Sequence, residues 1–562
     1  MKKKNKQVSA QVKKEIAVHA PDSILLAAGA AAIACITFLV FAPALNGTFT
    51  NWDDDTYVTA NELVKAPTMA WKEIFTTPVA LNYHPITMIT LRWNYQAEGL
   101  HPHAYFTTNL FFHLLNSILV FLFFYFLSGK KLLTGVISGI LFGIHPMHVE
   151  SVAWISERKD VLYVFFFLLS LLAYLRYREN KKMLWLVFCF LLFVLSCLSK
   201  AMAVVLPVVL LLIDYFQQRK LTKAHWLEKI PFLATSLVFG VIALRIQSGS
   251  ANETVQSFSF FQQFLFGCYG CIFYVIKFLF PVKLSAFYPY PIADGSQALP
   301  FLYYLSPIIL LVAAWLVYRY LRKESFIVFG CLFFIATIVL VLQFISVGNA
   351  IMAERYSYLS YAGFCFIAGY GFEKLYQGNH KLRTLITVSI AVIMLCFGYL
   401  THERTRVWSN SETLWSDVIS KYPGASTAYK NRGNYYGEKG NSAAAIKDYD
   451  VLLSMNTRDP EVFNNLGNIY ADQNKLQESL DAYSKAIALK PDYLNAHINR
   501  GISYNAMSQP DNALEDFSKA IDLNGQNSSL YAQRGYTYST MGKSTEAVAD
   551  FTSAINIQPD LA

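Results

Sequence analysis

The sequence predicts an all-α protein in which a polytopic bundle of membrane helices is followed by an α-solenoid. Two observations predict this fold class. Of the 562 residues, 54% are hydrophobic and 15% are aromatic, which is more apolar than a soluble protein of this length. The apolar residues gather in long segments within a transmembrane domain at 23–403, whereas the sequence from residue 426 onward repeats with a fixed period.

The N-terminal stretch 1–22 is rich in lysine and is expected in the cytoplasm, because positive residues concentrate on that side of membrane helices. The formal net charge of the chain is +9, but its positive residues lie beside apolar segments, which argues against a nucleic-acid partner. The first apolar segment is too continuous for a cleaved signal and is expected to remain as an anchor. The lysines of this stretch are Lys2, Lys3, Lys4, Lys6, Lys13 and Lys14.

Twelve apolar segments, each of about 16 to 23 residues, match the length that a bilayer core requires. Alternate loops are basic, and the basic stretches at 130–131, 176–182 and 219–229 all fall on the cytoplasmic side, as the positive-inside rule demands. Segment 264–280 breaks this alternation unless it re-enters or lies in the outer interface, so the prediction is eleven crossings with the N-terminus inside and the C-terminus outside. The segments begin near Ser23, Tyr105, Leu132, Val161, Met183, Met202, Pro231, Phe264, Phe301, Phe326, Ser357 and Leu382.

With this topology the outer surface receives the long first loop 47–104, the junction 145–160, the stretches 247–300 and 346–356, and everything after the last span. The stretches that contain the titratable and polar residues of interest therefore face one side of the membrane. Of the eleven histidines, six lie in the first loop, the second span or the junction, where one site can collect them: His84, His101, His103, His113, His145 and His148.

Three adjacent carboxylates, Asp53, Asp54 and Asp55, lie shortly after the first apolar segment. Their mutual repulsion and desolvation are unfavourable beside a membrane, so such acids are either solvated or held for chemistry. We expect these acids to take part in a reaction.

Other polar groups are expected on the same face. His145-x-x-His148 with Glu150 has the character of a metal site, but no further ligand spacing supports one, and no metal ligand is predicted. The cations Arg158, Lys159 and Arg355 either take part in the chemistry together with the acids, or extend to the membrane interface or pair with nearby acids. The nearby acids and the remaining histidine are Glu157, Asp160 and His84.

A polar stripe lies within the second apolar segment, where Asn109, His113 and Asn116 occur at i, i+4 and i+7. This spacing places the three side chains on one face of a helix. Helix packing explains such a stripe as readily as a functional site does.

The sequence after residue 426 repeats every 34 residues, because Gly433, Gly467, Gly501 and Gly535 are equally spaced. A unit of this length with small and aromatic positions is typical of the tetratricopeptide repeat, a helix pair that stacks into a superhelix. The predicted units are 426–459, 460–493, 494–527 and 528–561, and 404–425 is expected to form a linker and a capping helix.

Carboxamides recur beside the repeat glycines. In a row along a groove they can hydrogen-bond an extended peptide backbone without reading its sequence. This row resembles the asparagine ladder of the nucleocytoplasmic O-GlcNAc transferase, although asparagine is also common at this repeat position. The residues are Asn431, Asn465, Asn499 and Gln533.

A carboxylate just outside the bilayer, faced by cations at the same depth, suits transfer of a group from a phosphate-bearing lipid to an acceptor. The carboxylate would take the acceptor's proton, and the cations would stabilise the departing phosphate.

Several motifs are specific enough to indicate a family: Asn-Trp-Asp-Asp at 51–54, Tyr-His-Pro at 83–85, the run from His145 to Asp160, Phe-Tyr-Pro-Tyr-Pro at 287–291 and Met-Ala-Glu-Arg-Tyr at 352–356. With them the chain resembles a bacterial family of multi-span proteins with C-terminal tetratricopeptide repeats. That family is similar to the eukaryotic transmembrane and tetratricopeptide-repeat O-mannosyltransferases and, more distantly, to the protein O-mannosyltransferases of the GT-C fold.

The resemblance implies an inverting transfer of a mannose-like sugar from a polyprenyl-phosphate donor to Ser or Thr of extracytoplasmic proteins at a bacterial inner membrane. Asp53 or Asp54 corresponds to the family's catalytic base. No cofactor is implied, and the need for a divalent metal stays open. The residues implied in donor phosphate binding are His84, His145, His148, Glu157, Arg158, Lys159, Asp160 and Arg355.

Two alternatives to this function remain. A non-enzymatic scaffold would use the repeats to recruit an extracytoplasmic assembly, but an anchor alone would not need so many crossings or a polar outer face. Transfer of an oligosaccharide or another lipid-linked group shares the same geometry and is not distinguished by the sequence. In each case the lipid bilayer is a partner, and the repeats bind a protein acceptor or partner.

Overall fold

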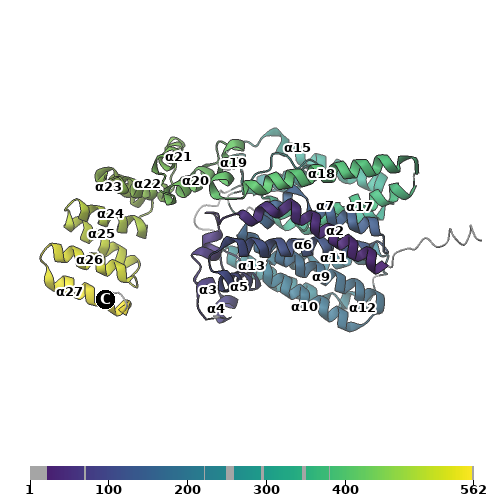
Figure 1. Ribbon diagram of the computed structural model, residues 1–562, viewed down its shortest axis with the longest axis horizontal. Helices are drawn as coiled ribbons and strands as arrows, with labels where there is room; N and C mark the ends of the chain where they lie inside the picture. Colours follow the sequence, from purple (N-terminus) through teal and green to yellow (C-terminus); the bar gives the residue numbers. More distant parts are fainter. Residues whose placement is uncertain are drawn as a thin grey trace, which may run out of the picture. The chain divides into compact units, whose positions relative to one another are not determined.

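The computed structural model describes residues 22–68, 71–220, 222–248, 258–292, 297–344, 348, 350–378 and 380–559. The chain divides into two compact units, Met1–Asp417 and Val418–Ala562. The first unit holds the apolar helices and the second holds the repeats (Figure 1). The lysine-rich stretch 1–21, on which the predicted cytoplasmic N-terminus depends, lies outside the described residues.

Every apolar segment expected from the sequence forms a helix, so the predicted all-α membrane bundle is confirmed. Among the described residues, seven helices are long and apolar enough to cross a membrane, or eight if one bent pair counts as a single span. The count of eleven crossings stays a prediction. The helices formed by the apolar segments, including those too short to count among the seven, are α2 (Asp22–Phe41), α6 (Pro102–Leu127), α7 (Leu132–Gly143), α9 (Arg158–Asn180), α10 (Met183–Ser199), α11 (Leu206–Phe216), α13 (Ile230–Ser248), α14 (Phe260–Leu279), α15 (Phe301–Leu316), α16 (Ser325–Ile338), α17 (Tyr361–Gly378) and α18 (Arg383–Val407).

The helices differ in how much of their surface the protein covers. Within their apolar windows, α9 is 72% buried and α6 is 61% buried, whereas the windows that contain α13, α15 and α18 are 6%, 11% and 11% buried. Apolar side chains on the peripheral helices are therefore exposed on the surface of the bundle, and α6 and α9 form the interior. Close packing inside depends on small residues, since a Cβ at Gly369 of α17 would lie 2.5 Å from the Thr134 carbonyl oxygen of α7.

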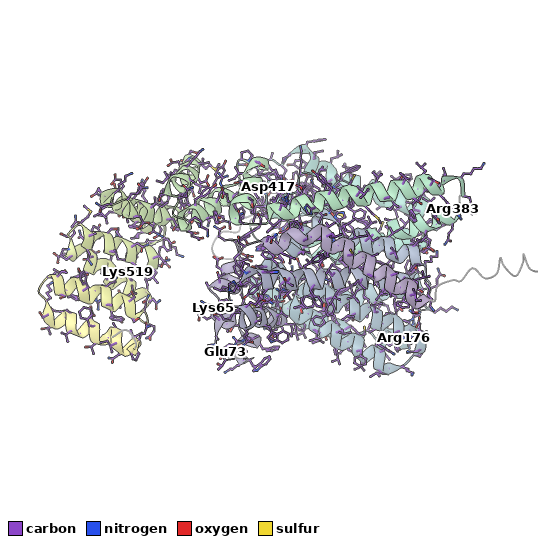
Figure 2. All side chains as sticks on the ribbon, viewed as in Figure 1. Lys65, Glu73, Arg176, Arg383, Asp417 and Lys519 are labelled. Carbon is purple, nitrogen blue, oxygen red and sulfur yellow. The ribbon has the colours of Figure 1, made fainter. Side chains whose placement is uncertain are left out.

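The first loop folds into a small cap with its own apolar core, made by residues such as Tyr57, Val64, Leu91 and Tyr105. Its helices lie together at one end of the bundle (Figure 1). Figure 2 shows Lys65 and Glu73 of this cap at one end of the first unit and Arg176 and Arg383 at the other. The elements of the cap are the short π-helical turn η2 (Asp55–Thr59), α3 (Glu62–Lys65), α4 (Trp71–Thr76) and α5 (Pro85–Glu98).

The junction 145–160 differs from its expected place on the outer surface, because the structure buries every one of its residues. After α7 the chain bends by 54° and continues through the turn η3 (Pro146–His148), α8 (Val149–Ala153) and the turn η4 (Ile155–Glu157) before α9 begins. The cap covers this junction from outside, since Ser156 and Lys159 contact Asp54 and Tyr57 of the first loop. Hydropathy alone gives no sign of that cover.

A two-stranded antiparallel sheet joins two other motifs of the first unit, 287–291 and 352–356. Its strands are β1 (Tyr288–Pro289) and β2 (Ala350–Met352), and Tyr288 pairs with Met352. The hydroxyl of Tyr288 also donates to Glu354 Oε1 at 3.0 Å. The sheet therefore fixes the backbone directly before Arg355.

The second unit consists of four helix pairs, and the predicted 34-residue repeats are confirmed. Each repeat glycine lies against the aromatic ring of its own second helix; a Cβ at Gly467 would lie 2.4 Å from the ring of Tyr483. Helix α19 (Ser411–Lys421) spans the boundary between the two units. The pairs are α20 (Ser426–Glu438) with α21 (Ser442–Ser454), α22 (Pro460–Asp472) with α23 (Leu476–Leu489), α24 (Leu494–Ala506) with α25 (Pro510–Leu523), and α26 (Ser528–Thr540) with α27 (Ser544–Ile557).

Candidate active site

The three adjacent acids of the first loop have different surroundings. Asp54 is 1% exposed, and its carboxylate accepts hydrogen bonds from the backbone N–H and the hydroxyl of both Thr50 and Ser156. These bonds fasten the loop to the turn before α9. Burial raises the pKa of Asp54 to about 6, and the bonds from Ser156 and Thr50 oppose that rise. Asp55 is exposed on the turn that follows.

Asp53 is the acid of the triad that lies partly open and next to the buried charges. Its side chain is half-buried, and burial raises its pKa above the ordinary value. The positive charges of Lys159 and Arg355 act in the opposite direction, whereas the charge of Glu157 adds to the rise. A carboxylate with a raised pKa is a better proton acceptor than an ordinary aspartate once it is ionised.

A network of ion pairs lies near Asp53, and together with Asp53 we call its residues the charged cluster: Asp53, Glu150, Glu157, Lys159, Asp160, Lys200 and Arg355. Glu157 is at its centre, because its carboxylate lies 3.0 Å from Lys159 Nζ, 3.4 Å from Lys200 Nζ and 3.3 Å from Arg355 Nε. Lys200 also pairs with Asp160, and the Arg355 guanidinium pairs with Glu150. Charges in a dry environment are costly unless they are paired in this way.

The cations of the charged cluster differ in their access to a ligand. The side chains of Arg355 and Lys200 are 18% and 12% exposed, whereas those of Lys159 and Glu157 are 7% and 1% exposed. Arg355 and Lys200 can therefore meet a phosphate that enters the site. Lys159 and Glu157 are the less exposed members, and the Glu157 carboxylate holds Arg355 and Lys200 in place through ion pairs.

His84 and Tyr57 form the side of the site next to Lys159. The His84 ring stacks on the Tyr57 ring with 5.2 Å between centroids, and Lys159 Nζ lies 3.2 Å from the Tyr57 hydroxyl. His84 is 3% exposed, and within the described part of the chain neither of its ring nitrogens has a hydrogen-bond partner. Burial and the charges of Lys159 and Lys200 lower the pKa of His84 to about 3, so the ring is neutral.

Tryptophan side chains form a wall on the other side of the acids. Trp52 stacks on Trp154 with 4.4 Å between centroids and also contacts Trp415 of α19 at 5.0 Å. The Arg355 guanidinium lies 5.4 Å from the centre of a Trp154 ring. The indole N–H of Trp415 donates to Asn51 Oδ1 at 3.1 Å, which fixes the start of the acidic loop. Such rigid aromatic faces orient flat or apolar ligand groups.

Three of the residues implied in phosphate binding point away from the charged cluster. Arg158 binds the backbone oxygen of Tyr105 at 2.8 Å and the side chain of Asn109. His145 bonds to the Phe278 carbonyl oxygen at 3.2 Å, and His148 bonds to that of Phe142 at 2.8 Å. These buried side chains hold backbone segments together. Their predicted contact with the donor is untested.

The polar stripe of α6 supports the bent junction. Asn109 donates to the carbonyl oxygens of Val152 and Trp154 at 3.3 and 3.0 Å, and Asn116 donates to that of Val161 at 2.8 Å. Non-helical backbone at membrane depth needs such partners, because lipid offers none. The stripe thus provides hydrogen-bond donors for backbone carbonyl groups of the junction that brings Glu150, Glu157 and Lys159 together.

The third member of the stripe, His113, has a partner at each ring nitrogen. Its Nε2 lies 3.0 Å from the Gly143 carbonyl oxygen, so Nε2 carries the proton. Its Nδ1 then accepts from the Tyr358 hydroxyl at 2.8 Å. This chain of bonds links α6, the end of α7 and the residues that follow Arg355.

No metal site is evident in the described part of the chain, where no three His, Cys, Asp or Glu side chains are grouped to hold an ion. The arrangement does contain a proton acceptor, two accessible cations and an aromatic wall. It can take a proton from a hydroxyl beside Asp53 and stabilise negative charge beside Arg355 and Lys200.

The carboxamides of the repeats make bonds between neighbouring units. Asn465 donates to Asn434 Oδ1 at 3.0 Å, and Asn499 donates to Asn468 Oδ1 at 2.9 Å. Asn431 is 8% exposed, and Gln533 is half-buried. These bonds align successive units, and the predicted contact with an extended peptide is untested.

Sequence reasoning did not select Lys200 or Tyr57. Lys200 follows α10 and belongs to the charged cluster through Glu157 and Asp160. The predicted topology places it on the outer side, where lysines are uncommon, and this exception to the positive-inside rule was the available signal. Tyr57 lies four residues after Asp53, but nothing in the sequence distinguishes it from the other tyrosines.

Comparisons with known proteins agree with the motifs. The family model "TPR repeat" matches residues 467–508, and models of the tetratricopeptide repeat match 494–527 and 528–561. Crystal structures of MamA and YrrB are 25% and 21% identical, covering 26% and 34% of this chain and 86% and 93% of those chains, each with a TM-score of 0.25. At that TM-score neither structure bears on function.

The relatives that match over most of the chain are protein O-mannosyl-transferases, which confirms the predicted resemblance to those transferases. The chain is 24% identical to protein O-mannosyl-transferase F38B6.6 of Caenorhabditis elegans over 66% of this chain and 53% of that protein. It is 24% identical to TMTC4 of Homo sapiens over 76% and 66%, and 23% identical to TMTC1 of Homo sapiens over 78% and 56%. The chain thus spans about half to two thirds of the length of these relatives.

Proposed function

We propose that this chain is an inverting membrane glycosyltransferase. It transfers a mannose-like sugar from a polyprenyl-phosphate donor to Ser or Thr hydroxyls of proteins outside the cytoplasm. The observation that carries the proposal is the position of Asp53, a partly open carboxylate directly beside buried cations at the end of the membrane bundle. The relatedness to protein O-mannosyl-transferases supports the class of reaction.

The proposed reaction has one displacement. Asp53 accepts the proton of the acceptor hydroxyl while the oxygen of that hydroxyl attacks the anomeric carbon of the donor sugar. The bond between that carbon and the phosphate oxygen breaks, and the phosphate leaves with the electron pair. Arg355 and Lys200 stabilise the charge of the leaving phosphate, because they are the more exposed cations of the charged cluster.

The remaining site residues position these groups. Asp54 fastens the acidic loop to Ser156, so that Asp53 keeps its place above Lys159. Neutral His84 supports Tyr57 by stacking and adds no competing positive charge. Trp52 and Trp154 provide a rigid face for the donor or the acceptor.

The repeats of the second unit bind the protein acceptor in this proposal. Tetratricopeptide units stack into surfaces suited to extended peptides. The protein lies in the inner membrane of a bacterium with its N-terminus in the cytoplasm, and the acidic loop and the repeats lie on the outer side. The basic loops of the sequence support this orientation.

Glycopeptide mass spectrometry of membrane and exported proteins tests the proposal in cells that carry the wild-type chain, Asp53→Asn or Asp55→Asn. The exposed Asp55 is a matched control, because its substitution removes the same charge from the same loop. We expect hexose masses on Ser and Thr with wild type and Asp55→Asn, and a loss of about 100-fold or more with Asp53→Asn.

Three outcomes would contradict the proposal in different ways. Unchanged glycopeptides with Asp53→Asn would remove Asp53 from the reaction. Identical profiles in the presence and absence of the gene, with proteins still retained on the repeats, would favour a scaffold. Oligosaccharide masses in place of single hexoses would indicate transfer of a preassembled glycan.

A further inference from the structure

A second polar site lies at the opposite end of the first unit from the cap. It is an open cavity of about 420 Å³ lined by Lys131, Lys323, Glu324, Ser325, Phe326, Tyr370, Lys374, Gln377 and Gly378. We call it the basic pocket. It lies where α7 and α16 begin and α17 ends, close in sequence to Arg383, which Figure 2 shows at this end of the unit.

The charges of the basic pocket are unbalanced. Three lysines and one glutamate line it, and Glu324 pairs with Lys374 at 2.6 Å. Lys131 and Lys323 therefore have no carboxylate among the pocket's lining residues to neutralise them. Lys131 Nζ lies 3.7 Å from the centre of the Tyr370 ring, which holds this ammonium at the pocket wall.

The floor of the pocket is rigid. Phe326 and Tyr370 stack with 4.6 Å between centroids. Beneath them, Glu373 of α17 accepts hydrogen bonds from the backbone N–H and the hydroxyl of Thr134, both at 2.8 Å, in the first turn of α7. Because this buried carboxylate already occupies the positive end of α7, an anion in the pocket would meet the lysines and not the helix terminus.

Two exposed leucines occur near the lining lysines in the sequence. Leu375, which follows Lys374, is 58% exposed, and Leu321, two residues before Lys323, is 37% exposed. A bound anion with long apolar chains could place them against these leucines and the lipid-facing side of the bundle. A free inorganic anion would gain nothing from that surface.

We propose that the basic pocket binds the phosphate-bearing head group of an anionic phospholipid, whose acyl chains lie along the exposed leucines. Lys131 and Lys323 contact the phosphate, and Tyr370 and Phe326 support the glycerol part. The volume is in the range of pockets that bind small ligands, and basic sites between membrane helices favour anionic lipids. The proposal is independent of the glycosyltransferase activity.

Native mass spectrometry of the full chain in detergent tests the proposal, with phosphatidylglycerol, phosphatidylcholine and inorganic phosphate as probes. The pocket variant is Lys131→Gln with Lys323→Gln. Its charge-matched control is Lys130→Gln with Arg322→Gln, because these neighbours carry the same charges in the same loops but do not line the cavity. We expect the pocket variant to bind phosphatidylglycerol about tenfold more weakly than wild type and the control to bind it normally.

Equal weakening in both double variants would overturn the proposal, because it would reflect the general charge of this end. Equal binding of phosphatidylcholine and phosphatidylglycerol by the wild-type chain would also overturn it. Binding of inorganic phosphate without binding of phosphatidylglycerol would assign the pocket to a soluble anion. If the pocket variant does not fold, photoactivatable phosphatidylglycerol is applied to the wild-type chain. Cross-links on the 370–378 segment support the proposal, and their absence there contradicts it.

Discussion

The three adjacent acids of the first loop illustrate how much a single residue depends on its surroundings. Asp53, Asp54 and Asp55 have the same chemistry and are neighbours, yet one is half-buried beside cations, one is buried among hydrogen-bond donors and one is exposed. The sequence leaves Asp53 and Asp54 equivalent as candidate bases. The hydrogen bonds of Asp54 favour Asp53, because an acceptor hydroxyl could not reach Asp54 without displacing Thr50 or Ser156.

Asp54→Asn is expected to affect stability more than any substitution at Asp55. The new amide would point a donor at one of the N–H or O–H groups that Asp54 now accepts from, and the cap would lose its fastening to Ser156. We expect a loss of about 3 kcal/mol in stability, seen as a lower melting temperature of the purified protein. Asp55→Asn is the control, with a change within about 0.5 kcal/mol. Equal melting temperatures for both variants would contradict the structural role of Asp54.

His84 is expected to make the protein sensitive to acid. Its pKa in the folded state is lowered to about 3, so its contribution to stability is complete above pH 6.5 and declines as the pH falls from 6.5 toward 3. In that range the His84 side chain binds a proton in the unfolded state but remains neutral in the folded state. Between pH 7.5 and pH 5 the loss from this one residue is about 2 kcal/mol.

Melting temperatures at pH 7.5 and pH 5 measure this effect in wild type, His84→Phe and His101→Gln. Phenylalanine keeps the ring that stacks on Tyr57 but does not titrate. We expect a smaller drop on acidification with His84→Phe, and an unchanged drop with His101→Gln because His101 is exposed. The same drop in all three proteins would show that His84 does not control acid stability.

At the scale of elements, the bent junction between α7 and α9 is the feature that assembles the site. Three short elements replace a continuous helix there, and side chains of α6 bind the carbonyl groups of Val152 and Trp154 within it and those of Gly143 and Val161 in the flanking helices. The spacing of Asn109, His113 and Asn116 predicted a polar helical face but not its partner. The partner is backbone, because a break inside a membrane bundle must be satisfied by protein.

The repeats also depend on close packing between the first and the second helix of each pair. Gly467→Ala would place a Cβ 2.4 Å from the Tyr483 ring, and we expect it to destabilise that repeat by about 1 to 3 kcal/mol. Gly437→Ala is the matched control, because its Cβ would meet nothing within 4 Å and alanine favours the helix. Hydrogen exchange followed by mass spectrometry should show faster exchange in α22 and α23 only for Gly467→Ala. Unaltered exchange there would contradict the packing argument.

At the scale of the whole molecule, the chain combines a membrane unit with a repeat unit, and the boundary matters for any dissection. Trp415 contacts Trp52, and Asp417 pairs with Arg404 at 2.7 Å, so the start of α19 belongs structurally to the first unit. A deletion that removed α19 would disturb the wall of the site as well as the repeats.

Deletion of 426–562 keeps α19 and removes all four repeats. We expect the remaining chain to insert into the membrane with its acidic loop intact, while glycosylation of protein acceptors falls, by about tenfold or more, because acceptor binding through the repeats is lost. Glycopeptide mass spectrometry and protease accessibility of the first loop provide the two measurements. Full glycosylation by the truncated chain would show that the repeats do not deliver the acceptor.

Much of the architecture was determined by the sequence alone. Long apolar segments predict membrane helices, and a 34-residue period predicts tetratricopeptide units, because both signals are local and recur along the chain. Motifs such as 51–54 and 145–160 indicated the homologous transferases. The segment 264–280 forms a helix long and apolar enough to cross, so its expected re-entrant or interfacial position stays a prediction.

Only the tertiary structure decided which of these residues share a site. Lys200, Glu157 and Arg355 lie far apart in the chain and meet through ion pairs, whereas Arg158, next to Glu157, turns toward Tyr105 and Asn109. Neighbouring side chains leave a turn in different directions, and the direction that reaches charge or backbone depends on what other helices place there. Burial and electrostatic pairing are long-range properties of the fold, so periodicity and motif spacing could not supply them.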